Sequence, residues 1–341
     1  MIPMFGYKPV RVVVVAGIAA LLSGCYYMQA ARGQFEVMNK REPIDDVINA
    51  TETPAGLSRR LELVKEARQF SIDELGLPDN ESYRSYADIE RDYVVWNVFA
   101  APEFSLQPKR WCFPVAGCVN YRGYFSEDAA RRKADQLGDD YDVAVGGIAA
   151  YSTLGRFSDP VLNTMMHWED TDLVAVLFHE LAHQVLYVKG DTGFNESFAT
   201  AVEEFGLERW LSSRDQQSEF TGYRERQAIN KRLMKHVEQA RLDLEAIYSS
   251  SIGAEEMRPR KKDRINQLNS DLNNELERSG QESPAWLGEG LNNARLASMN
   301  LYHGRLPEFR TLLEDCDDDL ECFYAAASDL ADRERDVPHR K

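Results

Sequence analysis

Residues 173–203 read LVAVLFHELAHQVLYVKGDTGFNESFATAVE, and this stretch predicts both the central packing and the chemistry of the chain. Its first half is apolar at nearly every position, so we expect a buried helix there. His179 and His183 are four residues apart and therefore lie on one face of that helix. Two imidazole nitrogens on one face can bind a single metal ion, with Glu180 beside them.

Glu180 is placed for acid–base chemistry next to such an ion. A carboxylate there can accept a proton from the attacking water and later pass it to the leaving amine. The alternative is that His179 and His183 are core residues hydrogen-bonded to backbone, because this short pattern also occurs without a metal. A buried polar group without a partner costs about 1 to 3 kcal/mol, which favours the metal interpretation.

A third ligand is needed, since a catalytic zinc has three protein ligands and one open position. Lys189 and Gly190 mark a helix end, and residues 195–210 are expected to form a second helix antiparallel to the first. Glu196 at its start is the best-placed ligand. Glu203 follows two turns later on the same face and is expected to accept a hydrogen bond from a ligand histidine. For Glu203, a solvated helix face is the alternative.

The HELAH and NESFA motifs resemble those of the gluzincin metallopeptidases, which include thermolysin and the leukotriene-hydrolase type of metallo-aminopeptidase. The resemblance implies one Zn²⁺ held by His179, His183 and Glu196, with Glu180 as general base. The wider chain, through YVVWNVF at 93–99, resembles the putative-aminopeptidase family of bacterial lipoproteins. That resemblance implies a peptide substrate.

Residues 143–151 are expected to form a strand ahead of the zinc-binding helix, and they contain no acidic side chain. The larger aminopeptidases that the chain resembles hold the substrate amino terminus with a glutamate in this region. Asp142 and Asp159 flank the strand and could bind an amino group or be turn residues. Gly146 and Gly147 would let a peptide approach an edge strand, or they mark a bulge. Exopeptidase and endopeptidase activity both stay open.

An oxyanion stabiliser should complete such a site, because the transition state for acyl transfer carries negative charge. Tyr302 is the first candidate and Tyr151 the second. The alternative for either residue is a packed aromatic ring with its hydroxyl satisfied locally.

The amino terminus predicts export. Two cations precede an apolar run at residues 12–22, which is shorter than the roughly 20 residues of a membrane span but suits a signal peptide. The run ends in LSGC, which resembles a bacterial lipobox and implies a signal peptide over 1–24 and a lipid on Cys25. Tyr26 is not the aspartate that retains lipoproteins at the inner membrane, so the outer membrane, facing the periplasm, is the expected location. The alternative is a secreted protein with a chance cysteine at this position.

The other four cysteines form two pairs with five residues between their members. In an oxidising compartment, short loops favour local disulfides. We therefore expect the pairs Cys112–Cys118 and Cys316–Cys322, although four cysteines allow three connectivities.

The net charge of the chain is −16. Such a surface repels the phosphates of nucleic acid, and the one basic cluster, near residues 258–264, is interleaved with acidic residues. We therefore expect no nucleic-acid partner.

The hydrophobic pattern predicts an α-rich α+β fold of zincin-like type, in which a small sheet packs against the HELAH helix and a mainly helical part follows. We expect a single catalytic unit over 25–341, with a helical and small-sheet part at 25–170 and a helical part at 171–341. Two separable domains divided near residue 170 are the alternative. The expected strands are 93–99, 119–125 and 142–152, and the other expected helices are 29–50, 54–75, 126–137 and a hairpin over 214–277 that breaks at 249–253.

Three functions are compatible with these patterns. The first is a membrane-anchored zinc peptidase. The second is a noncatalytic lipoprotein or chaperone that binds extended peptide, although binding alone does not require Glu180. The third is a zinc hydrolase of another substrate, such as a cell-wall peptide stem.

Overall fold

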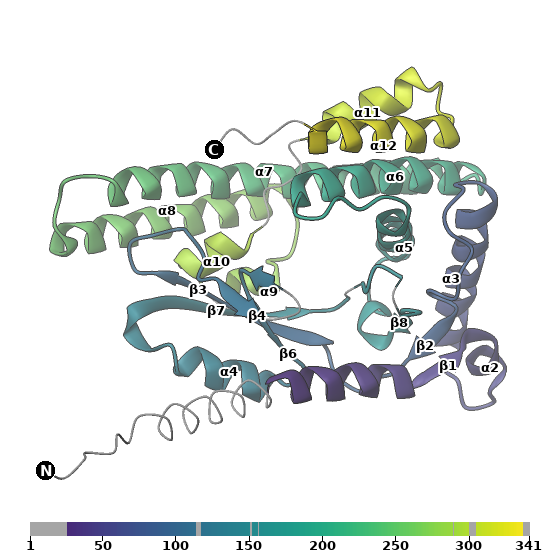
Figure 1. Cartoon of the computed structure of the whole chain (residues 1–341), viewed down its shortest axis with the longest axis horizontal. Helices are drawn as coiled ribbons and strands as arrows, with labels where there is room; N and C mark the ends of the chain where they lie inside the picture. The colour runs from purple at the N-terminus through teal and green to yellow at the C-terminus, as the bar shows by residue number, and fades with distance from the viewer. Residues whose placement is uncertain are drawn as a thin grey trace, which may run out of the picture.

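The computed structural model describes residues 26–113, 117–150, 152–155, 157–288, 290–299 and 305–336. Within these residues helices dominate and the strands form three small sheets, which agrees with the predicted α-rich α+β class. Figure 1 shows a helical layer above the strands, with α4 and the amino-terminal helix below them.

The helices are the segment 26–39, α2 (Ile44–Asn49), α3 (Ala55–Asp73), α4 (Glu127–Asp135), α5 (Asp170–Val185), α6 (Thr192–Ser212), α7 (Gln217–Tyr248), α8 (Ala254–Ser279), α9 (Ala285–Gly288), α10 (Asn293–Ser298), α11 (Leu306–Asp315) and α12 (Leu320–Asp336). The strands are β1 (Arg41–Pro43), β2 (Ser85–Ala87), β3 (Val95–Pro102), β4 (Trp111–Phe113), β5 (Gly117–Val119), β6 (Arg122–Tyr124), β7 (Tyr141–Ile148) and β8 (Val161–Leu162).

The largest sheet has the antiparallel order β6-β3-β7, so β7 forms an edge. Alternation along β3 sends Trp96 and Val98 to the face that packs on α4. Phe99 and Ala101 point to the opposite face, which α10 covers. This sheet is therefore enclosed between two short helices.

The HELAH helix is α5, and it packs mainly against α6 and α3. Its apolar side chains, from Leu173 to Ala182, belong to the main hydrophobic core. The strands that share this core are β2 and β8, which pair in parallel, with β1 antiparallel to β2. The sheet next to α5 is thus a minor one, and the larger sheet is held by α4 and α10.

The long helices α7 and α8 form the expected hairpin, which extends beyond the rest of the body on the left of Figure 1. Leu233, Val237, Ala240 and Leu244 recur at alternating spacings of four and three and are buried against α8. The hairpin therefore has an apolar seam of its own.

The predicted helix over 29–50 is wrong in its second half. The chain is helical over 26–39 and then forms β1 and the short α2. Pro43 has no N–H to donate and disfavours a helical conformation at the residue before it. The segment pairs with β2 instead, and Arg41 donates to the carbonyl of Ser158 at 2.9 Å.

Both predicted disulfides are present. Cys112–Cys118 links β4 to β5, and Cys316–Cys322 links the end of α11 to the start of α12. The local pairing expected from the short loops is confirmed.

Gly206 of α6 lies close against Leu75 and Phe178 of α5. A Cβ at this position would lie 2.7 Å from Leu75 Cδ1 and 3.0 Å from Phe178 Cδ2. Alanine normally stabilises a helix interior relative to glycine, but here it would force two buried side chains to move.

We predict that Gly206→Ala lowers the free energy of unfolding by about 1 to 3 kcal/mol. The matched control is Gly222→Ala in α7, where an added Cβ meets only Arg226 at 3.9 Å, and a gain of about 0.5 to 1 kcal/mol is expected. Urea denaturation of both variants measures the difference. Equal stabilisation by the two alanines would show that α6 has room at residue 206.

Candidate metal centre

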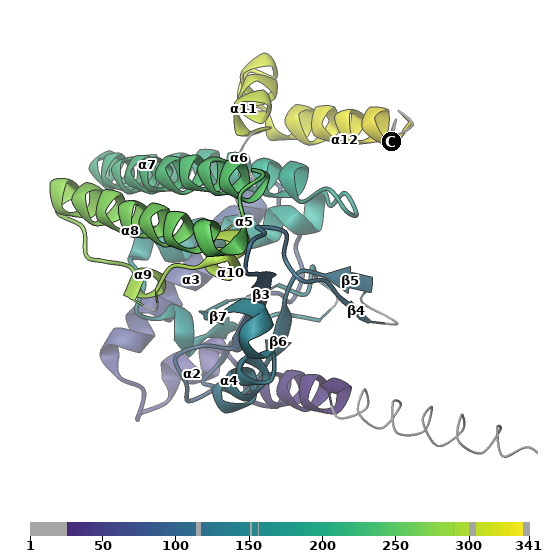
Figure 2. The ribbon, with the colours of Figure 1, turned by 90° about the vertical axis from the view of Figure 1, so that its left-hand side faces the viewer.

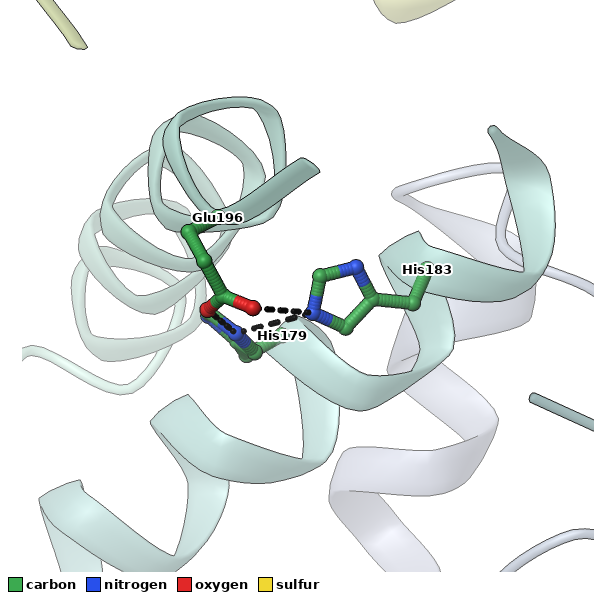
Figure 3. Close-up of side chains that lie close together, drawn as sticks. All are labelled: His179, His183 and Glu196. Carbon is green, nitrogen blue, oxygen red and sulfur yellow. Dashed lines mark hydrogen bonds and ion pairs between the residues drawn. The ribbon is translucent and has the colours of Figure 1, made fainter. Parts of the chain in front are cut away.

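His179 and His183 point their Nε2 atoms at the same place beside α5. The two nitrogens are 3.1 Å apart, and the rings meet edge to face with centroids 4.8 Å apart. Figure 3 shows Glu196 reaching toward both rings from the neighbouring helix. One of its oxygens is 3.3 Å from His179 Nε2, and the other is 3.9 Å from His183 Nε2.

These separations suit a small tetrahedral ion. Zinc binds nitrogen and oxygen at about 2.0 to 2.1 Å, so neighbouring ligand atoms lie about 3.3 Å from one another. Within the described part of the chain, these three residues form the one group whose ligand atoms lie close enough together to hold a metal ion. The Glu196 side chain is 33% exposed against 7% for His183, so the centre opens toward solvent on the glutamate side.

The loop between α5 and α6 sets the position of Glu196. Helix α5 ends at Val185, five residues earlier than the glycine expected to end it, and α6 begins at Thr192 rather than Asn195. The Asn195 side chain accepts a hydrogen bond from Val188 N at 2.7 Å and donates to Val188 O at 2.8 Å. The asparagine of the NESFA motif therefore ties the loop to α6 and fixes where the next residue points.

His179 is held from behind by a second carboxylate. Its Nδ1 lies 2.8 Å from Glu203 Oε2, and the Tyr223 hydroxyl of α7 donates to the other oxygen of Glu203. A partner on the outer nitrogen fixes the tautomer and the ring orientation of a ligand histidine. Tyr223 was not anticipated, because nothing in its sequence context separates it from a packed core tyrosine. His183 Nδ1, in contrast, is buried and has no hydrogen-bond partner among the described residues.

The carboxylates favour a positive charge at this place in the metal-free protein. Burial disfavours charged His179, but hydrogen bonds to Glu196 and Glu203 outweigh it and raise the pKa of His179 to about 10. Burial and the neighbouring His179 lower the pKa of His183 to about 4. One histidine is therefore charged and the other neutral at neutral pH, and a divalent cation would replace the proton on His179.

Glu180 lies on the same helix, next to the histidine pair. Burial raises the pKa of its carboxyl, while His179 lowers it and Glu196 raises it further. A hydrogen bond with the Ser152 side chain lowers the pKa again. A carboxyl with a raised pKa can both take and return a proton near neutral pH.

Ser152 lies next to two buried polar residues, Tyr83 and Asp159, and its single hydroxyl proton can be donated to one of them or to Glu180 at a time. Tyr83 has a φ of 62°, an uncommon conformation for a tyrosine, and its N–H donates to Asp159 O at 2.7 Å. No sequence pattern indicates a role for Tyr83, because a left-handed backbone at a non-glycine residue depends on tertiary contacts.

The loop that carries Tyr83 is fixed by the buried Arg68 of α3. Its guanidinium donates to the carbonyls of Pro78 at 2.5 Å, Asn80 at 3.1 Å and Ser82 at 3.1 Å. Asn80 in turn donates to Gln184 of α5 at 2.7 Å. Side chains of α3 and α5 thus fix the loop that carries Tyr83 beside the HELAH helix.

The two flanking aspartates have other partners. Asp142 forms an ion pair with Lys261 at 2.6 Å and accepts from Asn293 N at 2.9 Å. Asp159 is buried and accepts hydrogen bonds from Thr153 N and Thr153 Oγ1, each at 2.8 Å. Asp142 therefore links β7 to α8 and α10, and Asp159 lies beside Ser152.

The glycines of β7 make room for side chains of the chain itself. A Cβ at Gly147 would overlap the Tyr93 ring at 2.3 Å, and one at Gly146 would lie 3.2 Å from Arg295 Nη1. Neither the expected approach of a substrate nor a bulge is needed to explain these glycines, because both pair regularly with β3. Tyr302, Tyr151 and Cys25 lie outside the described residues.

The family model described as "Putative aminopeptidase" matches residues 25–341. The chain belongs to this family. The match contains both the α5–α6 pair and the sheet, and its description indicates a peptidase. Comparison with curated proteins and with solved structures found no match. Among the described residues, no helix is both long enough and apolar enough to cross a membrane.

The raised pKa of His179 predicts that the stability of the metal-free protein depends on pH. Its folded pKa of about 10 exceeds the unfolded value of about 6.5, so the stabilisation is complete below about pH 6.5 and is lost as pH rises toward 10. The melting temperature of chelator-treated protein should therefore decrease as the pH rises from about 7 to about 9.5.

His179→Gln should flatten this alkaline decline. The control is His167→Gln, because His167 is an exposed histidine outside the cluster, and this variant should retain the decline. An alkaline decline of the same size in His179→Gln would contradict the assignment of the proton to His179.

Proposed function

We propose that the chain is a zinc-dependent peptidase, most simply an aminopeptidase, with His179, His183 and Glu196 as metal ligands. The observation that carries the proposal is the convergence of the ligand atoms of these three residues, at 3.1 to 3.9 Å from one another, beside the half-buried Glu180. When bound there, a zinc ion supplies a Lewis acid for the scissile carbonyl and the attacking water.

Glu180 is the proposed general base. It accepts a proton from the attacking water and delivers it to the leaving amine, which the raised pKa of its carboxyl favours. Ser152 lies next to this carboxyl, and Glu203 with Tyr223 orients His179. Tyr302 is kept as a proposed oxyanion donor.

The edge of β7 favours cleavage near a chain end. The carbonyl of Val143 accepts from Asn292 Nδ2 and that of Val145 from Arg295 Nη2, both at 2.9 Å. An extended peptide laid along β7 would need these carbonyls, so this part of the edge is closed to strand addition. An internal cut requires peptide on both sides of the scissile bond, whereas a terminal cut requires it on one side. Endopeptidase activity is the alternative.

We also propose that residues 1–24 are a signal peptide, that Cys25 carries a lipid, and that the protein faces the periplasm from the outer membrane. Three observations support this: the LSGC sequence, a family match that begins at residue 25, and the two disulfides. Disulfides persist in oxidising compartments. The single catalytic unit over 25–341 is likewise proposed, since the main core draws on both halves of the chain.

The metal proposal predicts one zinc per chain with an affinity that depends on Glu203. Removing the partner of a ligand histidine commonly costs 10- to 100-fold in metal affinity, so we expect about that loss in Glu203→Gln. The control is Glu204→Gln, one residue along α6, whose carboxylate pairs with Arg310 on the surface. Competition with a chromogenic chelator gives the dissociation constants. Unchanged zinc affinity in Glu203→Gln would remove this residue from the centre.

The catalytic proposal predicts that the zinc-loaded chain digests a mixed peptide library and that Glu180→Gln is slower by about 10²- to 10⁴-fold. Mass spectrometry of free and acetylated versions of each peptide locates the cuts. An aminopeptidase fails on the acetylated peptides, while an endopeptidase cleaves both. The control Glu208→Gln, an exposed glutamate on α6, should keep full activity.

Absence of cleavage by folded, zinc-loaded protein would favour the peptide-binding or nonpeptide-substrate hypotheses. Full activity in Glu180→Gln with zinc still bound would contradict the role of Glu180.

A further inference from the structure

A cavity of about 510 Å³ lies between the start of the amino-terminal helix, the β4–β5 hairpin, β6 and α4. Its walls are aromatic and basic. Figure 2 shows these elements on the side of the molecule where the helix 26–39 begins. The aromatic residues that line it are Tyr26, Tyr27, Trp111, Phe113 and Tyr124. None of these residues belongs to the proposed metal centre.

The cavity carries three cations, Arg122, Arg132 and Lys133, and no carboxylate lines it. None of the three forms an ion pair with another described residue. The Arg122 guanidinium lies 4.2 Å from the centre of the Tyr26 ring, and its Nε is buried without a hydrogen-bond partner in the described chain. Burial and the nearby Arg122 and Lys109 lower the pKa of Lys133, which shows that cations crowd this place.

This concentration of positive charge is unusual for a chain with a net charge of −16. Uncompensated cations near one another are unfavourable unless an anion joins them. The flat aromatic walls, with Tyr26 and Phe113 stacked at 5.0 Å, provide an apolar surface beside the charges. The cavity therefore suits an anionic group that is attached to an apolar or glycerol-like body.

The position of the cavity indicates where that anion comes from. Tyr26 directly follows Cys25, the proposed lipid attachment point, and begins the helix 26–39. Met28, Arg32 and Phe35 form one outward stripe of that helix, because they are spaced by four and three residues. The Met28 side chain is 70% exposed and Phe35 63%. An exposed apolar stripe that includes a cation is typical of helices that lie in a membrane interface.

The inner face of the same helix is fixed to the sheet. Gln29 donates to Gly123 O at 3.3 Å and accepts from Phe125 N at 3.2 Å. The Met28–Phe35 stripe and the mouth of the cavity are therefore held in one orientation relative to the body. Met28 directly follows Tyr27, which lines the cavity, so the stripe begins beside the cavity.

We propose that this cavity binds the phosphate of an anionic membrane phospholipid and so orients the body on the membrane. Arg132 and Lys133 of α4 pair with the phosphate oxygens, Arg122 supplies a third positive charge, and the aromatic walls contact the glycerol part. The proposal rests on the proposed lipid attachment at Cys25 and is independent of the peptidase activity. Because the rest of the protein repels an anionic surface, this local site would decide which face approaches the membrane.

The test uses the full chain in a nonionic detergent, titrated with phosphatidylglycerol or with phosphatidylcholine, and native mass spectrometry counts the lipid retained per chain. We expect one phosphatidylglycerol to bind and phosphatidylcholine to bind far more weakly. The double variant Arg132→Gln/Lys133→Gln should weaken phosphatidylglycerol binding by about thirtyfold, since each cation near a lipid phosphate contributes about a fivefold effect.

The matched control is Arg131→Gln/Arg260→Gln, which removes the same charge from two exposed arginines that pair with glutamates of their own helices. It should bind phosphatidylglycerol like the unmodified chain. The melting temperature of Arg132→Gln/Lys133→Gln should be no lower than that of the unmodified chain, because Arg132 is exposed, Lys133 is half-buried and their removal relieves repulsion between cations.

Three outcomes would overturn the proposal. These are equal binding of the two lipids, unchanged binding in Arg132→Gln/Lys133→Gln, and equal weakening in the control variant. A further arm adds inorganic phosphate as competitor. If millimolar phosphate alone displaces the lipid completely, the cavity is a free-anion site and the lipid assignment fails.

Discussion

Two histidines and three glutamates are buried or half-buried between α5 and α6, and their mutual compensation constrains the rest of the structure. Charged groups tolerate such a place only when opposite charge lies within a few ångströms. The approach of α6 to α5 at Gly206 and the Asn195–Val188 hydrogen bonds bring Glu196 and Glu203 close enough to provide it. A metal ion would strengthen the same compensation, because the ligand atoms already lie at the separations of a tetrahedral site.

The surroundings of this cluster come from both halves of the chain. Arg68 of α3 fixes the loop that ends at Tyr83, and Tyr83 meets Ser152, which follows β7. Ser152 also lies close to Glu180, so the segment that follows the larger sheet approaches the HELAH helix at the group proposed as general base. The proposed lipid cavity lies at the other side of that sheet, beside α4 and the amino terminus. The two proposed sites would then lie on different sides of the same sheet.

The family match indicates a peptidase, and the geometry of the β7 edge bears on which kind of peptidase we propose. Asn292 and Arg295 occupy carbonyls on the outer edge of β7, which limits how far an extended peptide could pair along it. The acidic anchor that the larger aminopeptidases use is not supplied by Asp142, because Lys261 neutralises it. An amino terminus would therefore be recognised by other groups of this chain.

The sequence by itself determined the features with strong local signals: the apolar HELAH helix, a second helix after it, the α7–α8 hairpin and the two short-loop disulfides. The predicted antiparallel arrangement of the first two helices is wrong, because Figure 1 shows α5 end-on while α6 runs across it. Residue spacing also predicted that His179, His183, Glu196 and Glu203 belong to one centre, since three- and four-residue periodicity places side chains on one helix face. Tertiary structure alone decided the roles of Tyr223, Tyr83, Ser152 and Arg68. These residues act across elements far apart in the chain, and no local pattern records which distant partner a buried polar side chain will meet. The break at Pro43 and the packing of Tyr93 over Gly147 were decided in the same way, by pairing with β2 and by the approach of a distant ring.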